Sequence, residues 1–187
     1  LTLVDHGDVT VEDDDLEDAQ RRLGEAVARA RRDAALTVVL GGGHESAYGS
    51  YLGLGHPPRL GVINLDAHLD LREADRPTSG TPFLQIARDR RERGLDVRYV
   101  AIGVSTASNT TALFDTAREI GAQWVLDDDC QDAEAPLELV SRFVADVDEV
   151  YLSIDLDVLP GSAAPGVSAP AALGVPPVVI QAICDAV

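Results

Sequence analysis

Carboxylates and imidazoles follow three separate apolar segments of this chain, mostly at alternate positions. The set comprises six residues: His44, Asp66, His68, Asp70, Asp155 and Asp157. Residues two apart on an extended backbone point the same way, so side chains spaced in this manner can converge. Carboxylates gathered in this way need counter-charge, which divalent cations supply. Mixed imidazole and carboxylate ligands suit manganese, zinc or iron better than calcium, and six ligands with some bridging suit two ions.

Each stretch has a plainer interpretation when it is taken alone. His44 after three glycines can be a loop or cap residue, "DAHLD" (66–70) can begin a capped helix, and "DLD" (155–157) can be a solvated turn. Ligands of open α/β sheets bind at the carboxyl ends of the strands. Because three strand ends all carry ligand-type residues, the combination favours a dinuclear metal site.

Six segments rich in Val, Ile and Leu could form the strands that position these residues. They are Leu1–Val4, Thr37–Leu40, Leu60–Leu65, Val97–Val104, Gln123–Leu126 and Val150–Ile154. Helical spacing is found at Leu16–Ala35, Phe83–Arg93, Thr110–Ile120, Pro136–Val147 and from Pro176 onward. Strands that alternate with helices predict a mostly parallel sheet, and their continuous apolar character indicates that both faces are covered. The Pro-, Gly- and Ala-rich segment 160–177 is expected to be a functional loop.

Composition narrows the class of protein. The net charge of −17 argues against a nucleic-acid partner, because phosphates would be repelled. No apolar run approaches the roughly 18 residues of a membrane helix, and two cysteines are too few for a disulfide framework, which favours a reducing cytoplasm. The chain has no methionine and starts at Leu1 inside an apolar run. We therefore expect residues 1–187 to be one catalytic domain that lacks N-terminal and C-terminal portions.

Three blocks carry a resemblance to a known family: "GGGHE" (41–45), "DAHLDLR" (66–72) and "SIDLDVLPGSAAPGVSAP" (153–170). They are similar to the signature blocks of the arginase–agmatinase ureohydrolases, manganese enzymes that hydrolyse guanidino or formimino groups. Further stretches resemble the formimidoylglutamase branch: Gly43 in the first block, "TSGTPF" (78–83), "NTTALFDTA" (109–117) and "SAPAALGV" (168–175). The resemblance implies an arginase-like three-layer α/β/α sandwich that assembles as a homo-oligomer, a trimer or a hexamer.

The resemblance also implies how two Mn²⁺ ions would be held. One ion would take His44, Asp66, Asp70 and Asp155. The other would take Asp66, His68, Asp155 and Asp157, so that Asp66 and Asp155 bridge the pair. Asp70 would in addition be the catalytic residue, which orients a hydroxide and carries its proton to the leaving nitrogen.

The same resemblance implies a substrate, N-formimino-L-glutamate, which would yield L-glutamate and formamide in histidine degradation. Related arginases carry a histidine where this chain has Ser79 before Gly80, which puts arginase activity in doubt and makes Ser79 a candidate substrate contact. Arg72 could clamp a substrate carboxylate, or it could pair with Asp75. Asn109 could contact the substrate, or it could cap the helix that follows.

Three other functions stay open at this point. The chain could belong to an agmatinase or guanidino-acid hydrolase that releases urea from a small amidine. It could be a ureohydrolase-like subunit that no longer turns over, although all six expected ligands are present. It could also be an α/β binding domain whose acids only decorate the surface.

Overall fold

The computed structural model describes residues 2–187. Within them, six α-helices, four β-strands and two 3₁₀ turns follow one another along the chain. In order they are α1 (Leu16–Ala30), α2 (Ser46–Leu52), β1 (Leu60–Leu65), α3 (Pro82–Glu92), β2 (Tyr99–Val104), α4 (Thr111–Ile120), β3 (Gln123–Leu126), η1 (Asp127–Cys130), α5 (Glu134–Val144), β4 (Glu149–Ile154), η2 (Leu156–Val158) and α6 (Pro177–Ala186).

The four strands form one parallel sheet in the order β3-β2-β1-β4. All six residues of β1 and all six of β2 are buried, as expected for central strands with helices on both faces. Alternate residues serve opposite sides of the sheet. Val62 and Ala101 belong to one apolar core, whereas Ile63 and Ile102 belong to the other.

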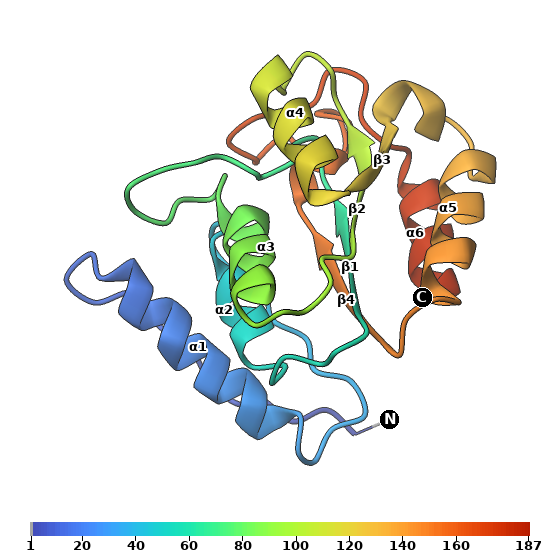
Figure 1. Ribbon diagram of the computed structural model, residues 1–187. Coiled ribbons are helices and arrows are strands. Elements are labelled where there is room, and N and C mark those ends of the chain that lie inside the picture. The colour runs from blue at the N-terminus through green and yellow to red at the C-terminus, as the bar shows by residue number, and fades with distance from the viewer. Residues whose placement is uncertain (1) are drawn as a thin grey trace.

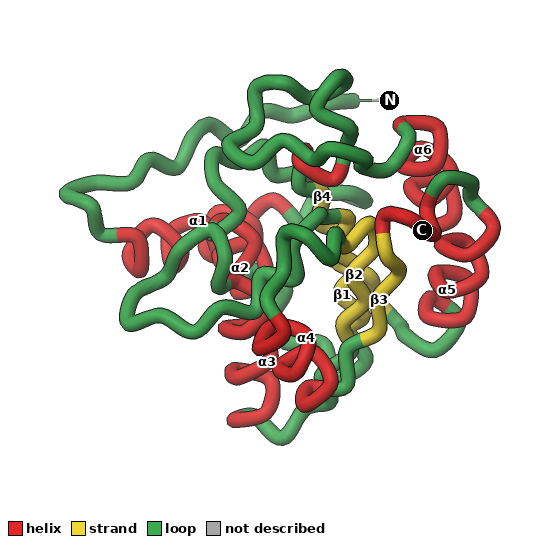
Figure 2. Tube along the Cα trace, turned by 90° about the horizontal axis from the view of Figure 1, so that it is seen from above, coloured by secondary structure: helices red, strands yellow, loops and turns green. Residues whose placement is uncertain are grey.

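The molecule has three layers, with the sheet in the middle (Figure 1). Helices α2, α3 and α4 cover one face, and α1 packs outside α2. Helices α5 and α6 cover the other face, as the view from above also shows (Figure 2). Gly103 in β2 adopts φ +92°, and a Cβ there would lie 2.5 Å from Val158 Cγ2, so the close packing of η2 on the strand requires glycine. The predicted α/β architecture with a mostly parallel sheet is confirmed.

Two of the six predicted strands are wrong. Thr37–Leu40 has no strand structure, and Leu40 is 93% exposed. Residues 2–4 of the first predicted strand are also irregular, and Leu1 lies outside the described residues. Strand formation needs a hydrogen-bonded neighbour. In the described part of the chain β4 pairs only with β1, and the run at 37–40 forms no ladder with the free edge of β4.

Smaller differences concern the helices. The predicted helix at Leu16–Ala35 ends at Ala30, and the predicted helix at Pro136–Val147 occupies Glu134–Val144. Helix α2 was not predicted, because its seven residues are too few to show a periodic pattern. The segment 160–177 is irregular up to α6, as predicted, and carries one isolated bridge between Pro160 and Ala171. Among residues 2–187, every helix is too short or too polar to cross a bilayer.

Candidate metal centre

The carboxyl ends of β1 and β4 deliver carboxylates to the same place. These strands pair in register, with Leu65 beside Ile154, and the next residues are Asp66 and Asp155. The backbone N–H of Asp155 donates to Leu65 O at 2.9 Å, and that of Asp66 donates to Ile102 O at 3.0 Å. Both acids are therefore fixed by extensions of the sheet ladder, and these two strand ends converge as expected.

Three carboxylates surround one imidazole nitrogen on the first side of the centre. His44 Nδ1 lies 2.8 Å from Asp70 Oδ2, 3.1 Å from Asp66 Oδ2 and 3.2 Å from Asp155 Oδ2. The ligand atoms of His44, Asp66 and Asp70 all lie within 4.8 Å of one another. Their side chains are largely buried, so the charges are poorly screened by water.

A second group lies on the other side of Asp66. His68 Nδ1 is 3.0 Å from Asp157 Oδ2 and 3.4 Å from Asp66 Oδ1. Asp157 is presented by the 3₁₀ turn η2, which Asp155 begins by accepting the N–H of Asp157 at 3.0 Å. The ligand atoms of Asp66, His68 and Asp157 also lie within 4.8 Å of one another.

Asp66 belongs to both groups and is fully buried. Its Oδ2 faces His44, whereas its Oδ1 faces His68 and accepts the backbone N–H of that residue at 2.7 Å. One carboxylate with its two oxygens turned toward two separate ligand sets has the arrangement of a bridge between two cations.

The protonation chemistry of His44 fits a metal ligand. Its Nε2 contacts Ser153 Oγ at 2.8 Å. Its Nδ1 is buried and makes no hydrogen bond of acceptable geometry, although three carboxylate oxygens lie nearby. After loss of its Nδ1 proton, His44 would donate from Nε2 to Ser153 and would turn an Nδ1 lone pair toward those oxygens. A cation among them would satisfy the lone pair and the carboxylates together, so the residues present fit such a group.

The electrostatics of the centre point the same way. Burial opposes a charge on His44, yet Asp155, Asp66 and Asp70 together raise its pKa to about 12. Asp157 and Asp66 raise the pKa of His68 to about 10 against the effect of burial. Burial raises the pKa of Asp70 to about 7, although His44 opposes this shift. The carboxylates thus stabilise positive charge close to both imidazoles, and a divalent cation in each group would supply that charge.

Two buried residues that the sequence analysis did not single out support the shared carboxylate. Asn64 Nδ2 donates to Asp66 Oδ2 at 2.9 Å and to the Tyr99 hydroxyl at 3.2 Å. The Tyr99 hydroxyl donates in turn to Leu69 O at 2.9 Å. Asn64 is the one polar residue in the strand "LGVINL" (60–65), and that exception in an apolar strand was the signal that could have identified it.

The predicted substrate contacts lie around this centre in different environments. Arg72 is exposed, its stem packs on Gly80, and it forms no ion pair with any acid in the described chain, Asp75 included. Ser79 is exposed in the loop before α3. Asn109 is partly buried, and its amide is bonded to the backbone of the turn that carries His68.

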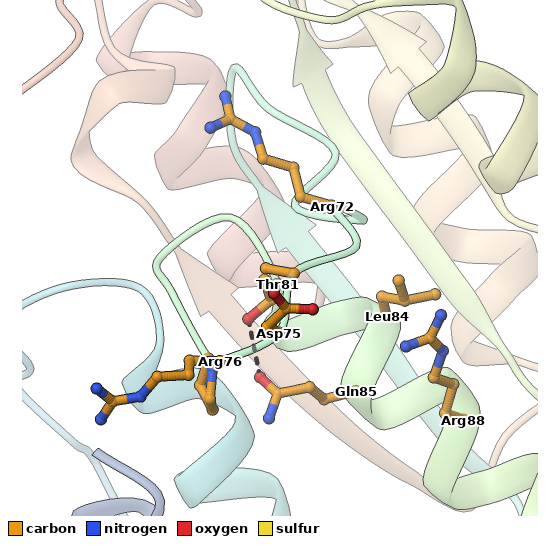
Figure 3. A pocket seen from close by; sticks show the side chains of 9 residues that line it. Arg72, Asp75, Arg76, Thr81, Leu84, Gln85 and Arg88 are labelled. Atoms are coloured by element: carbon orange, nitrogen blue, oxygen red, sulfur yellow. Dashed lines mark hydrogen bonds between the residues drawn. The ribbon is translucent and has the colours of Figure 1, made fainter. Parts of the chain in front are cut away.

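A cavity of about 200 Å³ lies beside Arg72 and has Arg76, Arg88 and Asp75 in its walls (Figure 3). Arg88 is paired with Glu73 at 2.6 Å, and Arg76 donates to Asp14 O at 2.8 Å. The three guanidinium groups point in different directions, and that of Arg72 turns away from the other two (Figure 3). The cavity is therefore not preformed to bind a single anion, although Arg72 forms no ion pair with Asp75 or with any other described acid.

Comparison with known proteins bears on the identity of the centre. The model of the arginase family matches residues 1–187. Formimidoylglutamase from Rhodococcus jostii is 52% identical over 195 residues, which cover 100% of this chain and 61% of that protein. Formimidoylglutamase from Chromobacterium violaceum is 53% identical over 189 residues, which cover 98% and 61%. The chain thus spans about 60% of the length of these relatives.

Solved structures agree with this result. The crystal structure of Trypanosoma cruzi formiminoglutamase with Mn²⁺ superposes with a TM-score of 0.83 at 28% identity, over 95% of this chain and 60% of that one. Arginase from Bacillus subtilis superposes with a TM-score of 0.81 at 24% identity, over 96% of this chain and 71% of that one, and shows the same fold. The expected arginase-like architecture is confirmed by these superpositions.

Proposed function

The chain belongs to the arginase family, and from that premise we propose that it carries the dinuclear Mn²⁺ centre of a formimidoylglutamase. The observation that carries the proposal is the position of Asp66 between two histidine–aspartate groups. Relatives about half identical to this chain are formimidoylglutamases, and a structural neighbour of that activity contains Mn²⁺. The single domain of residues 1–187 would then hold the whole metal centre.

Six residues would bind the two ions. His44 and Asp70 would hold one, His68 and Asp157 would hold the other, and Asp66 and Asp155 would bridge them. Two such cations, when bound, lower the pKa of a shared water so that it can act as a nucleophile near neutral pH. The remaining chemistry falls to side chains of this chain.

Asp70 is the best-placed group for proton transfer. It is buried and its Oδ2 lies 2.8 Å from His44 Nδ1, so its carboxylate would lie close to a water held between the ions. We assign it the role of taking the proton of the attacking water and delivering it to the leaving nitrogen. Water adds to the formimino carbon of N-formimino-L-glutamate, the bond from that carbon to the glutamate nitrogen breaks, and the products are L-glutamate and formamide.

Arg72 would recognise the substrate through a carboxylate. Its guanidinium has no acidic partner in the described chain, and it follows Asp70 by two residues. A planar guanidinium binds a carboxylate through two parallel hydrogen bonds, which an ammonium group cannot do. Ser79 lies next to Gly80, on which the Arg72 stem packs, and it would contact the substrate beside the clamp.

The test is formamide release from N-formimino-L-glutamate by the whole protein with added Mn²⁺. Arg72→Lys should raise KM at least tenfold, whereas Arg76→Ala, which changes another arginine of the same cavity, should leave KM unchanged. Urea from agmatine or guanidinobutyrate, without formamide from the formimino substrate, would instead identify a guanidino hydrolase. No product from any of these substrates would end the proposal.

The setting of the protein follows the same proposal. We propose a cytoplasmic enzyme of histidine degradation that works as a homo-oligomer, either a trimer or a hexamer. Two free cysteines, one buried and one exposed, agree with a reducing compartment.

A further inference from the structure

Asn109 has both of its amide hydrogens and one lone pair of its amide oxygen committed to backbone groups. Its Oδ1 accepts the N–H of Leu69 at 2.9 Å, and its Nδ2 donates to Ala67 O at 2.9 Å and to Ser105 O at 2.8 Å. Reversing the amide would place a donor against the Leu69 N–H and an acceptor against two carbonyls, so the orientation is determined by its neighbours. Both amide hydrogens are therefore used within the protein, and only the second lone pair of Oδ1 remains.

The backbone that Asn109 holds is the turn that presents two of the candidate metal ligands. Ala67 and Leu69 alternate with Asp66, His68 and Asp70, and both are buried. Both backbone polar groups of Leu69 are hydrogen-bonded to side chains. Asn109 Oδ1 accepts its N–H at 2.9 Å, and the Tyr99 hydroxyl donates to its carbonyl oxygen at 2.9 Å.

Asp70, the residue after Leu69, has an uncommon backbone conformation that needs such support. It adopts φ +48°, in the left-handed region that is costly for L residues, although less so for aspartate than for most. A strained backbone conformation persists only where the surrounding structure determines it. The side chain of Asp70 reaches His44 from this position, so a relaxed turn would move one ligand away from the first group and would also shift His68 in the second.

Asn109 does not act as the N-cap of α4. Thr110 is the N-cap of that helix and makes no side-chain capping bond, while the Asn109 side chain reaches back across 40 residues of sequence to Leu69. We propose that Asn109 is a positioning residue for the metal centre, which fixes the turn at 67–69 so that His68 and Asp70 converge on Asp66. The proposal rests on the proposed dinuclear function, and it replaces a substrate contact at this position.

The proposal predicts that substitution of Asn109 lowers the affinity for Mn²⁺. Residues that orient metal ligands from outside the coordination sphere typically contribute 10- to 100-fold to affinity. We expect Asn109→Ala to lower the affinity for Mn²⁺ by about 10- to 100-fold. Asn109→Asp should do at least as much harm, because it keeps the size of the side chain but turns a second oxygen toward the carbonyls of Ala67 and Ser105. Ser108→Ala, an exposed neighbour on the same loop, is the matched control and should bind Mn²⁺ like the wild type.

The experiment is calorimetric titration of Mn²⁺ into the metal-free whole protein, with hydrogen exchange at the Leu69 amide as a second readout. Weaker Mn²⁺ binding and faster exchange in both Asn109 variants, with KM near the wild-type value at saturating Mn²⁺, support the proposal. Unchanged Mn²⁺ affinity with a raised KM would overturn it in favour of a substrate contact. If Asn109→Ala does not fold, the isosteric Asn109→Asp carries the test. The titration needs no substrate, so the two proposals can fail independently. An inactive wild type would refute the proposed activity, whereas the role of Asn109 would still be decided by the Mn²⁺ affinities.

Discussion

Replacement of Asp66 by asparagine should abolish binding at both metal groups at once. Asp66 contributes one oxygen to the group with His44 and the other to the group with His68, so one substitution removes a ligand from each. Asp157→Asn removes a ligand from the second group alone. The two variants should therefore differ in degree, with the loss for Asp66→Asn about twice that for Asp157→Asn.

The size of the effect follows from linkage. A ligand that binds only the folded protein stabilises it by about 2.7 kcal/mol when its concentration is a hundredfold above Kd. For a chain of this size, each kcal/mol shifts Tm by about 2–4 °C, so each bound ion should raise Tm by about 5–10 °C. The wild type should gain about 10–20 °C from two ions, Asp157→Asn about half of that, and Asp66→Asn almost nothing.

Differential scanning calorimetry of the whole protein, with excess Mn²⁺ and with a chelator, measures these shifts. Asp128→Asn is the matched control, because Asp128 also follows a strand of the same sheet but is exposed and lies outside both ligand groups. Its Tm gain should equal that of the wild type. Equal Mn²⁺ stabilisation of the wild type and Asp66→Asn would refute the assignment of Asp66 as a bridge, and the absence of any stabilisation in the wild type would refute the metal centre.

Three further predictions concern protons, the support of Asp66 and the stability of the fold. At about pH 7.5, His44 with a pKa of about 12 and His68 with a pKa of about 10 are protonated without metal, so Mn²⁺ binding should release about two protons, measured calorimetrically in buffers of different ionisation enthalpy. Affinity should therefore rise with pH, and more steeply below about pH 7, where Asp70 must also lose a proton. Asn64→Leu removes the donor to the Asp66 carboxylate and should weaken Mn²⁺ binding about 10- to 100-fold in the same titration. Arg90 is 1% exposed and donates to three backbone carbonyls, so Arg90→Met should lower the free energy of unfolding by about 2–4 kcal/mol in urea, with Mn²⁺ affinity unchanged.

The central part of the fold could be predicted from the sequence. Continuous apolar runs at Leu60–Leu65 and Tyr99–Val104 become strands that are buried on both faces, because a parallel sheet between helices admits few other residues. The same rule was wrong at Thr37–Leu40. An apolar pattern indicates a preference for burial, but whether a ladder partner is available depends on the rest of the molecule.

The candidate ligands were accessible to sequence reasoning because their spacing is local. Asp66, His68 and Asp70 stand at alternate positions, and the parallel register places Asp155 beside them. The supports of the centre were not accessible in this way. The bond from Asn109 to Leu69 spans 40 residues and leaves no local pattern, whereas Asn64 is visible only as the one polar residue of an apolar strand.

The position of His44 shows how a ligand can be held without a strand beneath it. The preceding run at 37–40 is irregular, yet the loop that carries His44 is fixed from two sides. Helix α1 contributes the Gln20 side chain, which donates to Glu45 O at 2.8 Å. Strand β4 contributes two residues of one face, since the Tyr151 hydroxyl donates to Ala47 O at 3.2 Å and Ser153 contacts His44 Nε2.

These anchors have a consequence for the centre. Strand β4 contacts the His44 imidazole through Ser153, and Asp155 follows directly after its last residue. The same strand therefore positions both the imidazole and one carboxylate. A shift of β4 along the sheet would move Ser153 and Asp155 together, and with Ser153 it would carry His44. Both metal groups therefore depend on the register between β1 and β4. The shift would move His44 and Asp155 away from Asp66 and Asp70 in the first group, and Asp157 away from Asp66 and His68 in the second.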